Sequence, residues 1–188
     1  KFAKKSEFIE SNKRVLLAGF TYAESVSANA TTFIVDKFPL NKGTYRYLTG
    51  NLATSWGFLA AAEKSGLRLY QGSYPITPAT DILIELENRR DLGVRAYQAE
   101  DEIAGICSAI GAAFAGALAI TTTSGPGLSL KSEALGLAVM TELPLVVVDV
   151  QRGGPSTGLP TKTEQSDLYQ ALYGRNGECP VPVIAASM

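Results

Sequence analysis

The chain has 188 residues, of which 46% are hydrophobic and 19% are charged, and its net charge is −1. This length and composition suit one well-buried globular domain with an extension, and the balanced charge gives no support for a nucleic-acid or anionic-membrane partner. Histidine is absent, which excludes Ser-His and Cys-His catalytic pairs and histidine-ligated metals, so any chemistry must rest on carboxylates, hydroxyls, Lys, Arg or a cofactor.

Residues 1–50 are less regular than the rest, and we expect them to form an incomplete extension ahead of a domain over residues 51–188. The extension should hold a helix from Ser6 to Ala18, a short β run over Thr31–Val35 and a loop from Asp36 to Thr49. No apolar segment with a small-residue cleavage site follows Lys1, so this start is not a signal peptide. We expect the chain to begin inside a longer polypeptide.

Residues 51–98 predict a succession of helix, strand, helix and strand. The four elements are a helix over Leu52–Lys64 that stops at Gly66, a strand over Leu67–Tyr70, a helix over Asp81–Arg90 and a strand over Val94–Tyr97. Between them, Tyr74-Pro75-Ile76-Thr77-Pro78 is a rigid loop because of its two prolines. That rigidity suits a plain turn, which the loop alone favours, or presentation of the Thr77 hydroxyl. Thr77 or Thr80 could also cap the second helix.

Two further helices and two strands follow from residue 100. Glu100-Asp101-Glu102 opens a helix that continues to about Ala115 and is filled with small residues, so it should pack very closely against a neighbour. A strand over Leu118–Thr123 ends in Ser124-Gly125-Pro126-Gly127, and a helix follows over Leu128–Met140. Leu145–Val150 is apolar and β-branched, as expected of a fully buried strand.

The last segment is a Gly/Pro/Ser/Thr-rich loop over residues 153–163, followed by a helix from Glu164 to Tyr173. Strands and helices thus alternate, which predicts an α/β fold with a parallel sheet covered by helices on both faces. Ligands bind such sheets at the carboxyl ends of the strands. The loops 71–80, 124–128 and 151–165 should therefore converge at one edge and form the site.

Three polar groups at this edge have both a structural and a chemical interpretation. Acidic residues such as Glu102 are favoured at a helix N-terminus by the helix dipole alone, but a carboxyl group held in a dry interface can also share a proton with a ring nitrogen. Thr122 to Gly127 forms either a tight strand–helix turn or a cradle for an anion or ring; it is neither a P-loop nor GxGxxG. Arg152 is either a solvated loop cation or a bidentate clamp for a carboxylate. Thr161 and Glu164 could form a plain capping box.

The two cysteines, Cys107 and Cys179, lie far apart and cannot by themselves form a metal knuckle or hold an iron–sulfur cluster. Cys107 has apolar neighbours and is expected to be a small buried hydrophobic residue. The lack of a disulfide framework fits a reducing cytoplasm. No apolar run reaches the roughly 18 residues of a membrane span, so we expect no membrane partner.

Four motifs carry a resemblance to a known family. In chain order they are Tyr74-Pro75-Ile76-Thr77-Pro78, Glu100-Asp101-Glu102, Thr123-Ser124-Gly125-Pro126-Gly127 and Gln151-Arg152-Gly153-Gly154-Pro155-Ser156-Thr157-Gly158. Over residues 50 to 185 the chain resembles the alpha subunit, or alpha region, of 2-oxoacid:ferredoxin oxidoreductases, and the 2-oxoglutarate type fits best. The resemblance implies the pyrimidine-binding domain of the thiamine-diphosphate fold over residues 51–188, truncated at its C-terminus. Residues 1–50 resemble the end of a fused gamma-type region.

The resemblance also implies roles for individual residues. Glu102 is similar to the glutamate that hydrogen-bonds N1′ of the aminopyrimidine and favours the imino tautomer, so that the cofactor acts as its own base. Thr77 and Arg152 resemble residues of the 2-oxoacid pocket, where Arg152 would clamp the carboxylate, and Lys162 is a further candidate for substrate recognition. The remaining cofactor-binding candidates are Tyr74, Pro75, Ser124, Gly125, Pro126 and Gly127.

The resemblance implies that this chain is incomplete alone. Thiamine diphosphate would be shared with a beta subunit that carries Mg²⁺ and the diphosphate site, because the chain has no Gly-Asp-Gly with a downstream Asn. Iron–sulfur clusters are expected on partner chains, ferredoxin as the electron acceptor, and coenzyme A as the acceptor of the acyl group from 2-oxoglutarate, pyruvate or another 2-oxoacid. Two alternatives stay open: a non-catalytic structural or regulatory α/β domain that retains the motifs, and another thiamine-diphosphate enzyme subunit of the acetolactate-synthase type.

Overall fold

The computed structural model describes residues 6–26, 31 and 33–186, which divide into two compact units, Lys1–Tyr45 and Arg46–Met188. In the first unit, helix α1 covers Ser6–Ser25, so the predicted helix exists and extends seven residues beyond its predicted end at Ala18. Thr31 and residues 33–35 form no strand, and Thr32 lies outside the described residues, so the predicted β run is not found there. None of the described residues of α1 is buried, which leaves the helix without a core of its own.

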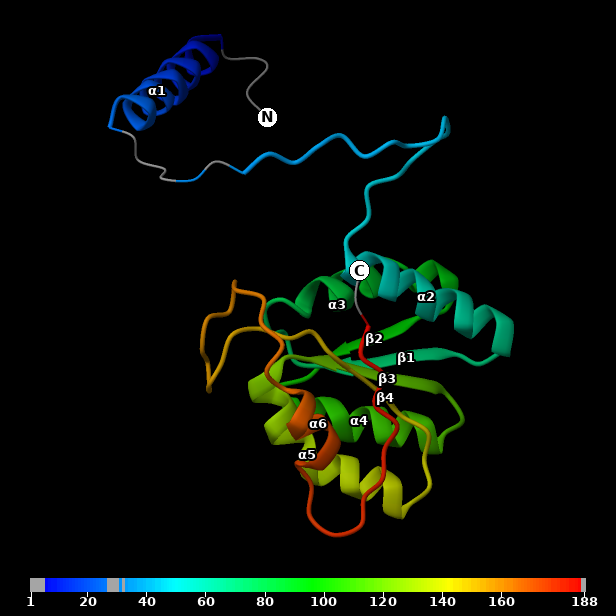
Figure 1. The fold of residues 1–188 in the computed structure, drawn as a ribbon. Helices are drawn as coiled ribbons and strands as arrows, with labels where there is room; N and C mark the ends of the chain where they lie inside the picture. Colours follow the sequence, from blue (N-terminus) through cyan, green and yellow to red (C-terminus); the bar gives the residue numbers. More distant parts are fainter. Residues whose placement is uncertain (1–5, 27–30, 32, 187–188) are drawn as a thin grey trace. The chain divides into compact units, whose positions relative to one another are not determined.

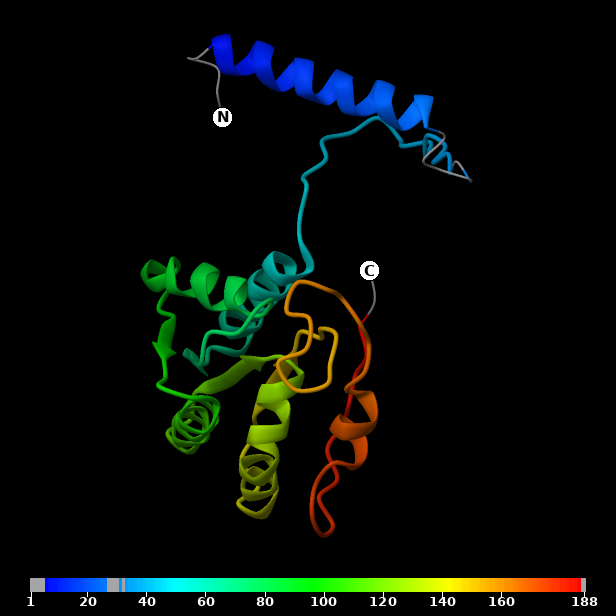
Figure 2. The ribbon, with the colours of Figure 1, turned by 90° about the vertical axis from the view of Figure 1, so that its left-hand side faces the viewer.

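The second unit contains a parallel sheet in the order β2-β1-β3-β4. The strands are β1 (Leu69–Ser73), β2 (Arg95–Gln98), β3 (Leu118–Thr123) and β4 (Val146–Asp149). The helices are α2 (Gly50–Ser65), α3 (Thr80–Glu87), α4 (Glu102–Phe114), α5 (Gly125–Met140) and α6 (Leu168–Tyr173), with a 3-10 turn over Arg90–Leu92. Figures 1 and 2 show α2 and α3 on one face of the sheet and α4 and α5 on the other. The predicted α/β fold is confirmed.

Each face of the sheet has its own apolar core. Under α2 and α3 the buried members are Leu69, Ile82, Leu86, Val94 and Ile120. Under α4 and α5 they are Ile106, Ile110, Ala134 and Ala138 in one cluster and Ala109, Ala113 and Ala119 in a neighbouring one. Burying a large apolar side chain stabilises a fold by about 1.5–3 kcal/mol relative to leaving it exposed, so these clusters hold helices to both faces.

The small residues of α4 bring that helix against β1, as predicted. A side chain at Gly72 would meet the carbonyl oxygen of Gly105 at 2.5 Å, and one at Gly105 would lie 3.2 Å from the Cα atom of Ser73. The two glycines therefore allow the helix and strand backbones to approach closely. This close approach fixes the distance between α4 and β1.

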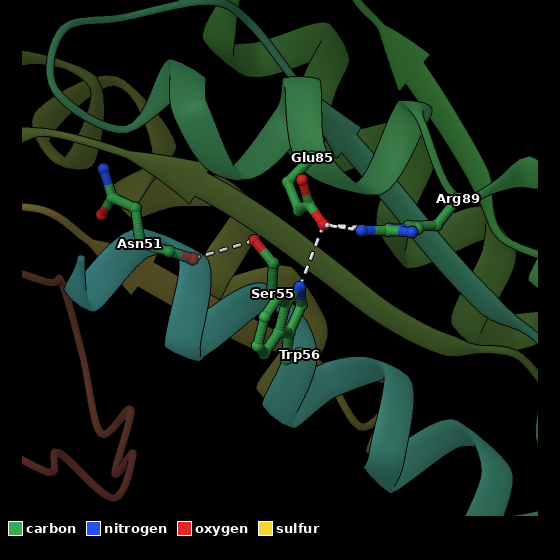
Figure 3. A network of polar contacts seen from close by, with 5 residues as sticks. All are labelled: Asn51, Ser55, Trp56, Glu85 and Arg89. Atoms are coloured by element: carbon green, nitrogen blue, oxygen red, sulfur yellow. Dashed lines mark hydrogen bonds and ion pairs between the residues drawn. The ribbon is translucent and has the colours of Figure 1, made fainter. Parts of the chain in front are cut away.

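Polar contacts define the ends of α2 and join α2 to α3, and Figure 3 shows the contacts of Trp56 and Arg89 with Glu85. Thr49 caps α2 by accepting a hydrogen bond from the backbone of Leu52, and Gly66 ends it with a φ of 69°. The Trp56 indole donates to Glu85 Oε1 at 3.0 Å, and Arg89 Nε donates to the same oxygen at 2.9 Å. The part-buried hydrogen bond from Trp56 to Glu85 joins α2 to α3.

Several predicted boundaries are wrong, for local reasons. Strand β1 starts two residues late and continues to Ser73, so the residues expected to begin a loop are paired with β2. Helix α5 begins at Gly125, so the glycine-rich motif supplies its cap and first turn and does not precede the helix. Helix α6 begins at Leu168, not Glu164, and Thr161 and Glu164 therefore cap no helix.

Two predictions of burial and one of capping are also wrong. Strand β4 lies at the edge of the sheet and is only partly buried, with Val146 40% exposed. Cys107 is exposed because it lies on the outer face of α4. Neither Thr77 nor Thr80 caps α3, whose N-cap residue is Ala79 and carries no side-chain cap.

Among the described helices, none is long and apolar enough to cross a membrane.

Candidate active site

The three predicted loops do converge at the carboxyl edge of the sheet. Arg152, which follows β4, donates from Nη1 to the carbonyl oxygen of Thr77 at 2.7 Å, so the loops after β4 and β1 are in direct contact. A methyl group at Gly125 would lie 2.8 Å from both carboxylate oxygens of Asp167, so the end of the loop after β4 also reaches the start of α5. The site residues therefore come from segments far apart in the sequence. Figure 2 shows the long loop near the start of α5.

Glu102 is the first residue of α4 and is only 9% exposed. Asp101 caps the helix by accepting a hydrogen bond from the Ala104 backbone at 2.7 Å. The acidic triplet thus divides its roles: Asp101 satisfies the helix N-terminus, which leaves the Glu102 carboxyl available for another partner.

Gly127 gives Glu102 its space in the first turn of α5. A side chain there would overlap Thr123 Oγ1 and would lie 2.9 Å from Glu102 Cγ and 3.3 Å from Glu102 Oε1. The glycine is required by this close approach, because its backbone has no unusual φ. The first turn of α5 and the carboxyl group of Glu102 therefore share one wall of the site.

Ser124 and Arg152 bring unsatisfied polar atoms to the same edge. Ser124 is fully buried at the N-cap position of α5, yet its Oγ makes no cap bond and has no hydrogen-bond partner among the described residues. Arg152 is 6% exposed, and its Nε likewise has no partner among them. Buried polar atoms are usually paired, so these two are suited to bind a ligand.

A polar layer supports the edge from the α2–α3 face of the sheet. The Gln71 amide donates to Thr122 Oγ1 at 3.0 Å, and the Thr122 backbone donates to Ser73 Oγ at 2.8 Å. All three residues are at most 1% exposed. These hydrogen bonds tie the ends of β1 and β3 together, although Gln71 Oε1 has no partner among the described residues.

The remaining predicted site residues are exposed or only partly buried. Lys162 is exposed; its backbone pairs with Gly153 and Leu159 and closes the loop after β4 into a compact turn. Tyr74 is 39% exposed and Pro75 is partly buried. The structure thus brings Glu102, Arg152, the Thr77 carbonyl and the Ser124–Gly127 segment to one edge, while Thr77 and Lys162 are both exposed residues.

Lys131 is a buried cation that the sequence interpretation missed. It lies in α5, is 0% exposed, and donates from Nζ to the Glu102 carbonyl at 2.8 Å and to Thr121 Oγ1 at 3.2 Å. Burial lowers the pKa of Lys131 to about 8. The signal that could have found it is its position on the helix face of Leu128, Ala134 and Ala138, where a charge is out of place.

Asp149 and Asp167 form a second unpredicted feature, a carboxyl pair at the end of β4. Burial, and then the neighbouring Asp167 carboxylate, raise the pKa of Asp149 to about 7. Two carboxylates this close disfavour simultaneous ionisation. The pair joins the two ends of the loop that carries Arg152.

Within the described parts of the chain, no group of three or more acidic or cysteine residues is arranged to hold a metal ion.

Comparisons with known proteins show what the chain is similar to. Residues 61–188 match the family model described as pyruvate flavodoxin/ferredoxin oxidoreductase, thiamine diphosphate-binding. The chain is 60% identical over 185 residues to the 2-oxoglutarate oxidoreductase subunit KorA of Mycobacterium tuberculosis, covering 98% of this chain and 28% of that protein. It is 46% identical over 142 residues to the 2-oxoglutarate synthase subunit KorA of Methanocaldococcus jannaschii, covering 75% of this chain and 37% of that protein.

A solved structure with the same fold is also similar. It is a 2-oxoglutarate:ferredoxin oxidoreductase from Magnetococcus marinus with 2-oxoglutarate, coenzyme A and succinyl-CoA bound, at 49% identity and a TM-score of 0.63. The match covers 71% of this chain and 23% of that one. The chain therefore spans only 23–37% of the length of these relatives.

Proposed function

This chain belongs to the thiamine diphosphate-binding family of pyruvate flavodoxin/ferredoxin oxidoreductases, and from that premise we propose that it supplies the aminopyrimidine half of the cofactor site in a 2-oxoglutarate:ferredoxin oxidoreductase. The whole enzyme would convert 2-oxoglutarate to carbon dioxide and an acyl-coenzyme A and pass the electrons to ferredoxin. The relatives' names support this substrate.

The observation that carries the proposal is the placement of Glu102. Its carboxyl lies at the carboxyl edge of the sheet, nearly buried, in a space that a side chain at Gly127 would fill. Nearby, Ser124 Oγ and Arg152 Nε are buried and unpaired among the described residues. A planar, nitrogen-bearing ring with polar edges fits such a set of groups, so the residues present fit thiamine diphosphate.

When bound, thiamine diphosphate would supply the carbon nucleophile for attack on the 2-oxo carbon and the electron sink for decarboxylation. Glu102 would hold a proton at N1′ of the ring, which is the contribution of this chain to the acid–base chemistry. The first turn of α5, Ser124 to Gly127, would line the ring. This division of roles needs no histidine, in agreement with the composition.

Arg152 is the group of this chain best placed to bind the substrate carboxylate. Its guanidinium donates from Nη1 to the Thr77 carbonyl, and this bond fixes its orientation. The Nε–H group has no partner among the described residues and can donate to a ligand. A planar guanidinium binds a carboxylate with high geometric specificity. Lys162, on the loop that begins at Arg152, would be the second cation for a dicarboxylic substrate.

The partner in this proposal is a beta subunit that carries Mg²⁺, the diphosphate site and an iron–sulfur cluster. The outer faces of α4 and α5 support a protein partner because large apolar side chains are exposed there. They are Ile103 (49%), Phe114 (82%), Leu130 (51%), Leu137 (43%) and Met140 (81%). Exposed apolar patches of this kind are common at protein–protein interfaces. Ferredoxin, coenzyme A and a cytoplasmic location complete the proposal.

Glu102→Gln tests the proposal. The full-length protein is co-expressed with its beta subunit, and 2-oxoglutarate- and coenzyme A-dependent reduction of methyl viologen is measured with thiamine diphosphate and Mg²⁺. We expect assembly to persist and turnover to fall at least about a hundredfold, the size of a lost acid–base contribution. Glu100→Gln, at an exposed acid two residues earlier, is the matched control. Wild-type turnover in Glu102→Gln would refute the assignment, and silence of the assembled, cluster-loaded wild type with every 2-oxoacid would favour a non-catalytic domain.

A further inference from the structure

Lys131 is a fully buried ammonium group that the proposed chemistry does not use. Its Nζ donates to the carbonyl of Glu102 in the first turn of α4 and to the hydroxyl of Thr121 on β3. One side chain of α5 thus joins α4 to the sheet at the residue that carries the candidate acid–base group.

This location is costly for a cation. Burial of an ammonium is unfavourable unless it is paired, and the N-terminus of a helix carries a partial positive charge that repels it. Among the described residues, the ionisable groups that oppose the effect of burial on the pKa of Lys131 are Glu102 first, then the N-cap residue Asp101 and Cys107, all at the N-terminal half of α4. Thr121, the facing residue on β3, is uncharged. A methionine of similar length would avoid these costs, so a stabilising role alone does not account for the lysine.

The geometry shows what the cation adds. Gly127 and Lys131 are four residues apart and therefore lie on the same side of α5. Gly127 lies against the Glu102 side chain, whereas Lys131 binds the Glu102 carbonyl. Thr121 and Thr123 lie on the same face of β3. Thr121 accepts a hydrogen bond from Lys131, and Thr123 lies beside Gly127. Two successive turns of α5 therefore face Glu102: Gly127 leaves space for its side chain, and Lys131 binds its backbone carbonyl.

We propose that Lys131 is a positioning residue that fixes the first turn of α4 to β3 and thereby sets where the Glu102 carboxyl meets the aminopyrimidine ring. This inference rests on the proposed function of Glu102. Its consequence is specific: loss of the ammonium should weaken only those ligand contacts that pass through Glu102. A general packing role would instead affect every ligand and the stability alike.

The test measures the dissociation constant of thiamine diphosphate in the full-length complex with its beta subunit. Lys131→Met removes the N–H donors and keeps the length of the side chain. We expect it to bind thiamine diphosphate about tenfold more weakly, the effect of one charge-assisted hydrogen bond. A pyridyl analogue, in which N1′ is replaced by carbon, should bind the variant and the wild type within about twofold, since it cannot pair with Glu102. Lys64→Met, at an exposed lysine of α2, is the control.

A double-mutant cycle with Glu102→Gln separates positioning from packing. If Lys131 acts through Glu102, the double variant should bind thiamine diphosphate no more weakly than Glu102→Gln alone. Additive losses, or equal losses for thiamine diphosphate and its pyridyl analogue, would overturn the inference. If Glu102→Gln weakens binding and Lys131→Met does not, the inference fails while the proposed function stands. If Glu102→Gln changes neither binding nor turnover, the proposed function itself fails.

If Lys131→Met does not assemble, Thr121 provides the same test. Thr121→Val removes the hydroxyl that accepts from Lys131, and Thr121→Ser retains it. We expect Thr121→Val to bind thiamine diphosphate more weakly than Thr121→Ser, and to show no such difference with the pyridyl analogue. Equal affinities of the two variants for thiamine diphosphate would overturn the inference.

Discussion

Replacement of Gly127 by alanine tests whether α5 must approach Glu102 closely. The added methyl group would overlap Thr123 Oγ1 and lie 2.9 Å from Glu102 Cγ. Thr123 is fully buried on β3, and its branched side chain has few alternative rotamers, so it cannot move aside cheaply. The strain must therefore move α5 or the Glu102 side chain, and either movement changes the candidate site.

Gly136 provides the matched control in the same helix. An alanine side chain at Gly136 would meet no atom within 4 Å, so Gly136→Ala should keep the gain of about 1 kcal/mol that alanine has over glycine in a helix. At Gly127 the overpacking cost of about 1–3 kcal/mol should cancel or exceed that gain. The two variants should differ by about 1–3 kcal/mol in the free energy of unfolding, or about 2–12 °C in melting temperature for a domain of this size.

Thermal unfolding of both variants, followed by circular dichroism, measures this difference. The dissociation constant of thiamine diphosphate is then measured in the complex with the beta subunit. We expect Gly127→Ala to melt below Gly136→Ala and to bind thiamine diphosphate more weakly. Equal melting temperatures together with an unchanged dissociation constant would refute the argument that this glycine makes room for Glu102.

Three further predictions concern the loop after β4 and the α2–α3 contact. Arg152→Ala should raise the KM for 2-oxoglutarate about tenfold or more, since a charge-assisted contact to the carboxylate is lost; an unchanged KM would exclude a carboxylate clamp. The pKa of Asp149 is raised from 3.8 to about 7 by burial and by Asp167. The protonated Asp149 carboxyl therefore stabilises the fold fully below pH 3.8, and this stabilisation is lost as the pH rises through 7. Melting temperatures from pH 4 to 8 should therefore fall less steeply in Asp149→Asn than in the wild type, and parallel curves would contradict this. Trp56→Phe removes the indole hydrogen bond to Glu85 and should destabilise the chain by about 1 kcal/mol in denaturant unfolding; no change would show that solvent replaces this bond.

The fold class and the edge that holds the site could be predicted from the sequence. The alternation of strand and helix patterns from residue 51 is local information, and it predicts a parallel sheet because short right-handed crossovers leave few other arrangements. The same rule places the loops after β1, β3 and β4 at one edge. Glu102 opens a helix and Arg152 follows a strand, each within a motif of the resemblance, and their roles in the site stay predictions.

Only the tertiary structure decided how these groups are supported. Lys131 bonds to a residue 29 positions away and Arg152 to one 75 positions away, and no periodicity in the sequence encodes such pairs. Burial was misjudged for the same reason: Cys107 has apolar neighbours in sequence but lies on the outer face of α4. By itself the sequence determined the type and order of the helices and strands from residue 51 onward, though not their ends, because backbone preferences act over a few residues. The packing of α5 against α4 and β3 decided which polar groups are buried together, because burial depends on contacts between distant segments.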